Sequence, residues 1–287
     1  MSPAPRVDAH QLFWDPARFD YPRLATDLAP LRRTFGPADL RPDLAREGIT
    51  ATVLMQALPS IPETRHLLSM AAGEGFVAGV VGWVDLSATD VDRQLEELRS
   101  APGGEYLVGL RHAACAEPDP EWLLGDEVRR GLVAVESAGL AFDLHICTRE
   151  LPAALALGRD HPGLRLVVDH LAAPPIASGD LSAWGRAILP LAELPNVSAK
   201  ISGLVTEADW HTWSIDDLRH PVELALDVFG PGRLMLGSDW PRCLLAGSYA
   251  DAVDSCRYLL AELPAHDQDA IRGGTAIRAY RLSIPTD

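Results

Sequence analysis

The sequence predicts one α/β domain over residues 1–287, folded as a (β/α)8 TIM barrel. Short β-branched runs alternate with longer amphipathic stretches from one end of the chain to the other. There are eight such runs, the number of strands that closes a small parallel barrel. Barrels of this type commonly reach the length of this 287-residue chain as a single domain.

The predicted strands are short and largely apolar, as parallel strands covered on both faces are expected to be. In chain order they are Pro5–Leu12, Thr50–Gln56, Phe76–Val84, Leu107–His112, Ala141–Ile146, Arg165–His170, Val197–Ser202 and Leu234–Gly237. The clearest helices have apolar residues at helical spacing. They are Asp90–Arg99, Glu127–Ala138, Leu151–Arg159 and Asp217–Phe229.

Charge and composition exclude some classes of partner. The formal net charge is −15, which argues against nucleic acid and anionic membranes because both bind basic surfaces. No stretch has the pattern of a signal peptide or the length of a bilayer span, so we expect a cytoplasmic protein. The four cysteines lack the spacing of a zinc ribbon, and we expect most of them to be buried, reduced thiols.

Almost every predicted strand ends in a side chain that can take part in catalysis or binding. These residues are His10, Gln56, Asp85, His112, His145, His170, Lys200 and Asp239. The carboxyl ends of barrel strands converge on one opening, where active sites form. A single histidine would be weak evidence, but several at equivalent positions predict a shared site.

The first predicted strand ends in the segment Asp8–Trp14, which resembles the Asp-x-His-x-His-x-Trp motif of amidohydrolase-superfamily lactonases. In that motif, two histidines two residues apart project from one face of a strand and can hold one metal ion. This chain keeps His10 but has Leu12 in the second position. His145, Asp239 and His10 would supply two nitrogens and one oxygen to a divalent metal, zinc first among them. A metal-free site with the same residues is the equal alternative.

The segment Gly237–Pro241 follows an apolar strand and resembles the eighth-strand Gly-Ser-Asp-Trp-Pro turn of the same family. The resemblance implies that Asp239 is the general base that takes a proton from the attacking water. It also suggests that Trp240 packs against a sugar ring or against the rim of the barrel. The alternative for Asp239 is a helix-capping role.

Two further segments match the family pattern. Asp169-His170 resembles its Asp-His-(Leu/Ile) motif, which implies that His170 polarises the substrate carbonyl or shuttles a proton. Lys200 lies in the matching segment Ala199–Leu204 and would stabilise negative charge on the attacked carbonyl oxygen. A structural role for His170 and an ion-pairing role for Lys200 are the alternatives.

Substrate contacts are expected from two other strands. Gly109–His112 resembles the family's Gly-(Ile/Leu/Val)-Arg-His segment. We expect either Arg111 or His112, but not both, to face the opening, because neighbouring strand residues point in opposite directions. Arg111 would suit a carboxylate or an oxyanion, or else a structural ion pair. Gln56 is expected to hydrogen-bond to substrate hydroxyls.

The matched segments run from Val7 to Leu282 and are most similar to the L-fucono- and L-rhamnono-lactonase group of the amidohydrolase-2 superfamily. The resemblance implies an enzyme whose partner is a small-molecule aldonolactone, opened by water that Asp239 activates. Three alternatives stay open: a 2-pyrone-4,6-dicarboxylate-type lactonase, a decarboxylase of the same superfamily, and a non-catalytic sugar-acid-binding protein. The sugar, the ring size and the oligomeric state are not specified by the pattern.

Overall fold

Eight parallel strands lie in chain order in the computed structural model, which describes residues 4–26 and 28–284. They are β1 (Val7–Leu12), β2 (Ala51–Met55), β3 (Val77–Gly82), β4 (Leu107–His112), β5 (Ala141–Leu144), β6 (Arg165–Val168), β7 (Val197–Ile201) and β8 (Leu234–Leu236). All eight predicted strands are present, with ends within two residues of the expected ones. The predicted (β/α)8 barrel is therefore confirmed.

The first and last strands meet and close the barrel. Gln11 forms a parallel bridge with Trp240, and the Leu12 amide donates to the Trp240 carbonyl at 2.7 Å. The amide of Asp239 donates to the carbonyl of His10 at 2.8 Å. Closure thus places residues from the two ends of the chain side by side at one opening.

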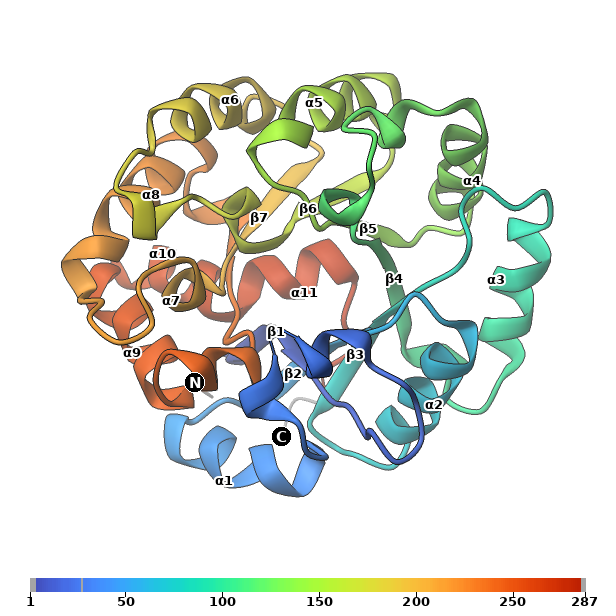
Figure 1. Cartoon of the computed structure of the whole chain (residues 1–287), viewed down its shortest axis with the longest axis horizontal. Helices are drawn as coiled ribbons and strands as arrows, with labels where there is room; N and C mark the ends of the chain where they lie inside the picture. Colours follow the sequence, from blue (N-terminus) through green and yellow to red (C-terminus); the bar gives the residue numbers. More distant parts are fainter. Residues whose placement is uncertain (1–3, 27, 285–287) are drawn as a thin grey trace.

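Most of the helices form an outer ring around the strands, whereas α11 (Thr275–Tyr280) lies across the middle of the barrel (Figure 1). The longer ones are α1 (Pro37–Glu47), α2 (Ile61–Ala71), α3 (Val91–Ser100), α4 (Asp126–Ser137), α5 (Leu151–Asp160), α6 (Ser182–Ala192), α8 (Ile215–Phe229) and α9 (Tyr249–Leu259). The shorter ones are α7 (Leu204–Glu207), α10 (Ala265–Asp269) and α11. The four helices predicted from periodicity correspond to α3, α4, α5 and α8, each within two residues.

Local sequence explains where these helices begin. The Ser60 hydroxyl accepts a hydrogen bond from the Glu63 amide and so caps α2. At the start of α8, the amide and the hydroxyl of Ser214 both donate to the Asp217 carboxylate, at 2.7 Å and 2.9 Å. At its far end, α1 stops at Gly48, whose φ of 64° suits glycine. Among residues 4–26 and 28–284, no helix combines the length and the apolar character needed to cross a bilayer.

The strands stop just before several of the predicted functional residues. The expected sixth strand ended at His170, but β6 ends at Val168. His170 and Leu171 have φ values of 52° and 51°, so the chain turns through a left-handed conformation there. Such a conformation cannot continue a β ladder, and it turns the His170 side chain away from the strand pattern.

Candidate active site

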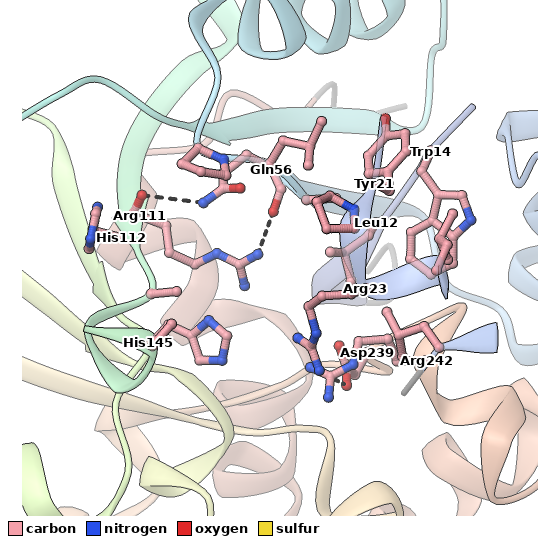
Figure 2. A pocket seen from close by; sticks show the side chains of 18 of the residues that line it. Leu12, Trp14, Tyr21, Arg23, Gln56, Arg111, His112, His145, Asp239 and Arg242 are labelled. Atoms are coloured by element: carbon pink, nitrogen blue, oxygen red, sulfur yellow. Dashed lines mark hydrogen bonds and ion pairs between the residues drawn. The ribbon is translucent and has the colours of Figure 1, made fainter. Parts of the chain in front are cut away.

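A cavity of about 300 Å3 opens at the carboxyl ends of the strands. Its polar lining consists of His10, Gln56, Arg111, His112, Glu117, His145, Asp239, Arg23 and Arg242. Its apolar lining includes Leu12, Trp14, Tyr21, Leu24, Leu28 and Leu58. Figure 2 shows Arg111, His112 and His145 on one side, with Leu12, Tyr21 and Trp14 grouped on the opposite side. The polar face formed by Arg111, His112 and His145 therefore lies opposite an apolar face formed by Leu12, Trp14 and Tyr21, below which Arg23, Asp239 and Arg242 are drawn in Figure 2.

Three buried side chains form a cluster beside this cavity: His10 and Asp239, which line it, and His170, which is not among the lining residues. Each offers one ligand atom, and these atoms all lie within 4.8 Å of one another. The Oδ1 atom of Asp239 is 3.6 Å from Nε2 of His10 and 3.9 Å from Nε2 of His170. Residues from β1, from the turn after β6 and from the turn after β8 thus form one cluster.

The buried carboxylate of Asp8 holds together the two segments that carry His10 and Asp239. Asp8 accepts hydrogen bonds from the hydroxyl of Ser238 at 2.6 Å and from its amide at 2.9 Å. It also accepts one from the Tyr249 hydroxyl at 3.1 Å. Asp8 therefore couples β1 to the turn after β8. This positioning role was not predicted, although Asp8 begins the first-strand motif.

The turn after β7 orients His170. Nδ1 of His170 lies 2.9 Å from the Ser202 hydroxyl, so Nε2 faces Asp239. Gly203 follows with φ of 63°, and a Cβ atom built there would lie 2.6 Å from Nδ1 of His170. A side chain at this position would displace the imidazole. The glycine is thus required both by its backbone conformation and by the close approach of the ring.

Both histidines of the cluster favour the neutral form. Burial, more than any neighbouring charge, holds the pKa of His10 well below its usual value. Burial likewise lowers the pKa of His170 to about 4, although Asp239 opposes this shift. Near neutral pH, each ring therefore has a lone pair available to bind a metal ion or to accept a hydrogen bond.

The cluster suits a divalent metal ion. Nε2 of His170 and both carboxylate oxygens of Asp239 are buried without a hydrogen-bond partner in the described part of the chain. Two imidazole nitrogens and one carboxylate oxygen are a donor set that zinc accepts. The predicted third ligand was His145, but the structure brings His170 into the cluster instead. His145 lines the cavity, and its ring centre lies 6.0 Å from that of His170.

Lys200 lies beneath the cluster. It is completely buried and contacts carboxylate oxygens of Asp143 at 2.5 Å and Asp169 at 2.9 Å. Its Nζ also lies 3.2 Å from Nδ1 of His10. It is not among the residues that line the cavity. This placement fits the ion-pairing alternative, with Lys200 supporting His10 from below.

Two carboxyl groups beside Lys200 have opposite pKa shifts. Burial raises the pKa of Asp143 to about 6, against the lowering effect of Lys200. Burial also favours the neutral form of Asp169, but the charge of Lys200, with a hydrogen bond to His10 and the charge of Arg111, outweighs it and holds the pKa of Asp169 well below its usual value. From α11, the hydroxyl of Tyr280 donates to Asp143 at 2.6 Å. Asp169 is therefore the anion that balances Lys200 and faces His10.

Arg111 reaches into the centre of the polar face. Its Nη1 lies 3.2 Å from Oδ2 of Asp169 and 3.3 Å from Nε2 of His10. Its Nη2 donates to the carbonyl of Gln56, and the Gln56 amide approaches the Arg111 carbonyl at 3.4 Å (Figure 2). Arg111 thus combines the ion pair expected of a structural residue with the exposure to the cavity expected of a binding residue.

His112 also lines the cavity, so the expectation that only one of Arg111 and His112 would do so is wrong. The ring of His112 stacks on Trp122 with centres 3.9 Å apart. Its Nδ1 accepts from the Trp83 indole at 3.2 Å, and Nε2 lies 2.7 Å from Glu117. Because His112 is the last residue of β4, its side chain leans over the strand end instead of alternating away from the opening.

Trp240 is buried and packs against Phe13 and Phe35, with ring centres 5.9 Å and 5.4 Å apart. It is not among the cavity-lining residues, so it stabilises the closure of the barrel instead of contacting substrate there.

Sequence reasoning missed Tyr21 and Arg242, which do line the cavity. Arg242 follows the eighth-strand motif directly, which was a usable signal, whereas Tyr21 lies in an irregular segment with no such signal.

Comparison with known proteins defines the class of this chain. Residues 7–282 match the Amidohydrolase (Amidohydro_2) family model. The chain therefore belongs to the amidohydrolase family, a family of hydrolytic enzymes. It is 41% identical to an L-fucono-1,5-lactonase from Burkholderia ambifaria, over 98% of this chain and 97% of the relative. It is 38% identical to an L-fucono-1,5-lactonase from Burkholderia multivorans, over 98% of each chain.

A solved structure agrees with these relatives. An amidohydrolase from Burkholderia multivorans with bound zinc superimposes with a TM-score of 0.91 at 36% identity. The superposition covers 98% of this chain and 100% of the Burkholderia multivorans chain. The shared fold therefore extends over the strands and turns that carry the candidate active site.

Proposed function

We propose that this enzyme hydrolyses a sugar-acid lactone to the free acid, with Asp239 as the general base. The carboxylate of Asp239 carries the proposal, because it is buried, free of hydrogen bonds in the described part of the chain, and adjacent to two neutral histidines. A carboxylate held in this way can accept a proton from a water molecule. The lactonase names of the two Burkholderia relatives support the same reaction class.

The proposed reaction starts with the lactone in the cavity and its carbonyl oxygen directed toward the polar face. Asp239 takes a proton from water as the water oxygen bonds to the carbonyl carbon. The tetrahedral intermediate then collapses, and the ring carbon–oxygen bond breaks. The proton held by Asp239 passes to the departing ring oxygen, so the carboxylate is restored and the product is a hydroxy acid. Arg111 faces the cavity and favours negative charge on the attacked carbonyl oxygen.

We propose His10, His170 and Asp239 as the residues that hold a divalent metal, with zinc favoured. Zinc in the Burkholderia multivorans structure supports this choice. When bound, such an ion supplies Lewis acidity that polarises a carbonyl or acidifies a water molecule. Leu12 cannot act as a ligand, so the site depends on this smaller set of donors. Arg111 and Lys200 both approach His10 and constrain its ring.

The apolar face suggests which lactone is bound. Leu12, Trp14 and Tyr21 form this face, and three further leucines also line the cavity. L-Fuconic acid has a methyl group where ordinary hexonic acids have a hydroxymethyl group. Burying a methyl group against these side chains stabilises the complex, whereas burying an unpaired hydroxyl there costs free energy. A 6-deoxyaldonolactone such as L-fucono-1,5-lactone is therefore the proposed substrate.

A panel of lactones tests the proposal. The panel pairs each 6-deoxyaldonolactone with its hydroxymethyl counterpart and adds 2-pyrone-4,6-dicarboxylate, and acid release is followed with a pH indicator. We expect hydrolysis with the highest kcat/KM for the methyl member of the matched pair. Hydrolysis of the pyrone alone would favour the dicarboxylate lactonase. Tight binding of an aldonolactone without any acid release would instead identify a sugar-acid-binding protein.

A further inference from the structure

Two cysteines occupy equivalent places at the rim of the cavity. Cys115 lies in the short helix η4 (Ala114–Ala116) after β4, and Cys147 immediately precedes η6 (Thr148–Glu150) after β5. β4 and β5 pair in register up to His112 and Leu144, and each cysteine lies three residues beyond its strand partner. Neighbouring strands are about 4.8 Å apart, a separation within the Cα distances that a disulfide bridges.

Contacts beyond the strand ends keep the two segments together. The Cys115 amide donates to the carbonyl of His145 at 3.1 Å. Arg149 donates to the carbonyls of Cys115 and Glu117, so η6 is tied to η4. Cys147, and after it His145, lower the pKa of the Cys115 thiol, so the three side chains are close neighbours. The two segments that carry the cysteines are therefore held side by side.

We propose that Cys115 and Cys147 form an oxidisable dithiol, a modification site whose reactant is a peroxide. The sulfur of one thiol attacks one oxygen of hydrogen peroxide, so that an S–O bond forms as the O–O bond breaks, and the products are a sulfenic acid and one water molecule. The second thiol then attacks this sulfur and releases a second water. Two electrons and two protons leave the thiols, one disulfide bond forms, and the peroxide is reduced to two molecules of water.

Exposure distinguishes this pair from the other two cysteines. Cys115 and Cys147 are partly exposed, whereas Cys243 and Cys256 are buried. This corrects the expectation that most of the cysteines are buried. A peroxide in solution can therefore reach the pair more easily than it can reach Cys243 or Cys256, which serve as internal references.

The disulfide would act on the cavity wall. Ala116, Glu117 and His145 line the cavity beside the two thiols. A covalent link between η4 and the residue before η6 fixes this part of the wall and removes the Cys115 thiol beside His145. We expect the oxidised enzyme to differ from the reduced enzyme in KM for its lactone, with recovery after treatment with dithiothreitol.

Intact-mass measurement and peptide mapping after hydrogen peroxide treatment of the folded enzyme test this proposal. We expect the loss of two hydrogen atoms, a fall from four titratable thiols to two in denatured protein, and one linked peptide containing Cys115 and Cys147. Cys115→Ser and Cys147→Ser should each abolish the linked peptide, while Cys256→Ala, the matched control, should retain it. Thermal melting checks that each variant is folded.

The mass readout does not depend on lactonase activity, so failure of the dithiol and failure of the proposed function are distinguishable. A linked peptide that reverts with dithiothreitol supports the proposal even if no lactone is turned over. Persistence of four free thiols, a disulfide only between two molecules, or oxidation of either cysteine to sulfinic acid without a linked peptide would each overturn it.

Discussion

Nδ1 of His170 lies 2.9 Å from the hydroxyl of Ser202, and this contact directs the opposite ring nitrogen toward Asp239. The contact joins the turn after β6 to the end of β7, so one hydroxyl controls the orientation of a candidate ligand. Such partners of a functional histidine affect metal affinity and activity without touching the substrate themselves.

Replacing Ser202 with alanine tests this orienting role. We expect Ser202→Ala to reduce zinc affinity or kcat by about 10–100-fold, with little change in thermal stability. Ser202→Thr keeps the hydroxyl and is the matched control, expected to restore most of the loss. Zinc affinity is measured by competition with a chromophoric chelator, and kcat by acid release. Equal zinc affinity and kcat in wild type and Ser202→Ala would show that the contact is not needed.

Lys200→Met tests whether Lys200 acts through buried ion pairs. The substitution leaves Asp143 and Asp169 without their shared cation, and breaking a buried pair typically costs about 3–5 kcal/mol. We therefore expect a large fall in the free energy of unfolding, measured with urea. The double variant Lys200→Met/Asp143→Asn should recover part of this loss, because one buried carboxylate has been made neutral. Unchanged stability in Lys200→Met would contradict the assignment.

The pH dependence of stability should change when His170 is replaced. Its pKa is lowered to about 4, so between about pH 6.5 and 4 the unfolded state binds a proton that the folded state does not. The folded state therefore loses stability as the pH falls through this window. Asp143, whose pKa is raised to about 6, instead stabilises the folded state as the pH falls. The contribution of His170 must therefore be measured as the difference in stability between wild type and a His170 variant.

Urea unfolding of metal-free wild type and His170→Gln at several pH values isolates this contribution. The stability of wild type relative to the variant should fall from pH 6.5 to pH 4 and stay constant above pH 7. Asn196→Gln lies outside the cluster and serves as a control with no expected pH-dependent difference. Parallel pH profiles of wild type and His170→Gln would disagree with a buried neutral imidazole.

Leu12→His restores the second histidine of the first-strand motif. Leu12 lines the cavity and is two residues from His10, on the same side of β1. We expect tighter zinc binding because a third imidazole becomes available, and a higher KM for the methyl-bearing lactone because the apolar face loses a leucine. Leu12→Asn controls for lost hydrophobic area without adding an imidazole. Zinc binding unchanged from wild type would show that position 12 does not reach the metal.

Sequence reasoning located the strands, and with them the opening where polar side chains gather, because hydrophobic periodicity and strand ends are local properties. It also identified Asp239, since the turn that carries it has a distinctive motif. It placed His170 in the same site as His10 but did not predict that His170, in place of His145, would complete the candidate metal ligands, because this depends on the left-handed backbone after Val168. The direction of such a turn is set by tertiary contacts.

The sequence pattern also could not predict which polar side chains reach the cavity and which are buried beneath it. Lys200 and Arg111 were both expected to face substrate, but only Arg111 reaches the cavity. The difference follows from Asp143 and Asp169, which come from other strands and draw Lys200 into the barrel interior. Trp240 likewise packs against Phe13 and Phe35, contacts that exist only once β1 and β8 have met.

The most direct test of the account is kcat/KM for L-fucono-1,5-lactone in wild type and Asp239→Asn. The amide has nearly the same shape as the carboxylate but cannot accept the proton of water, so we predict a loss of about 10²–10⁴-fold, with the fold verified by circular dichroism. Wild-type kcat/KM in correctly folded Asp239→Asn would contradict the proposed role of Asp239.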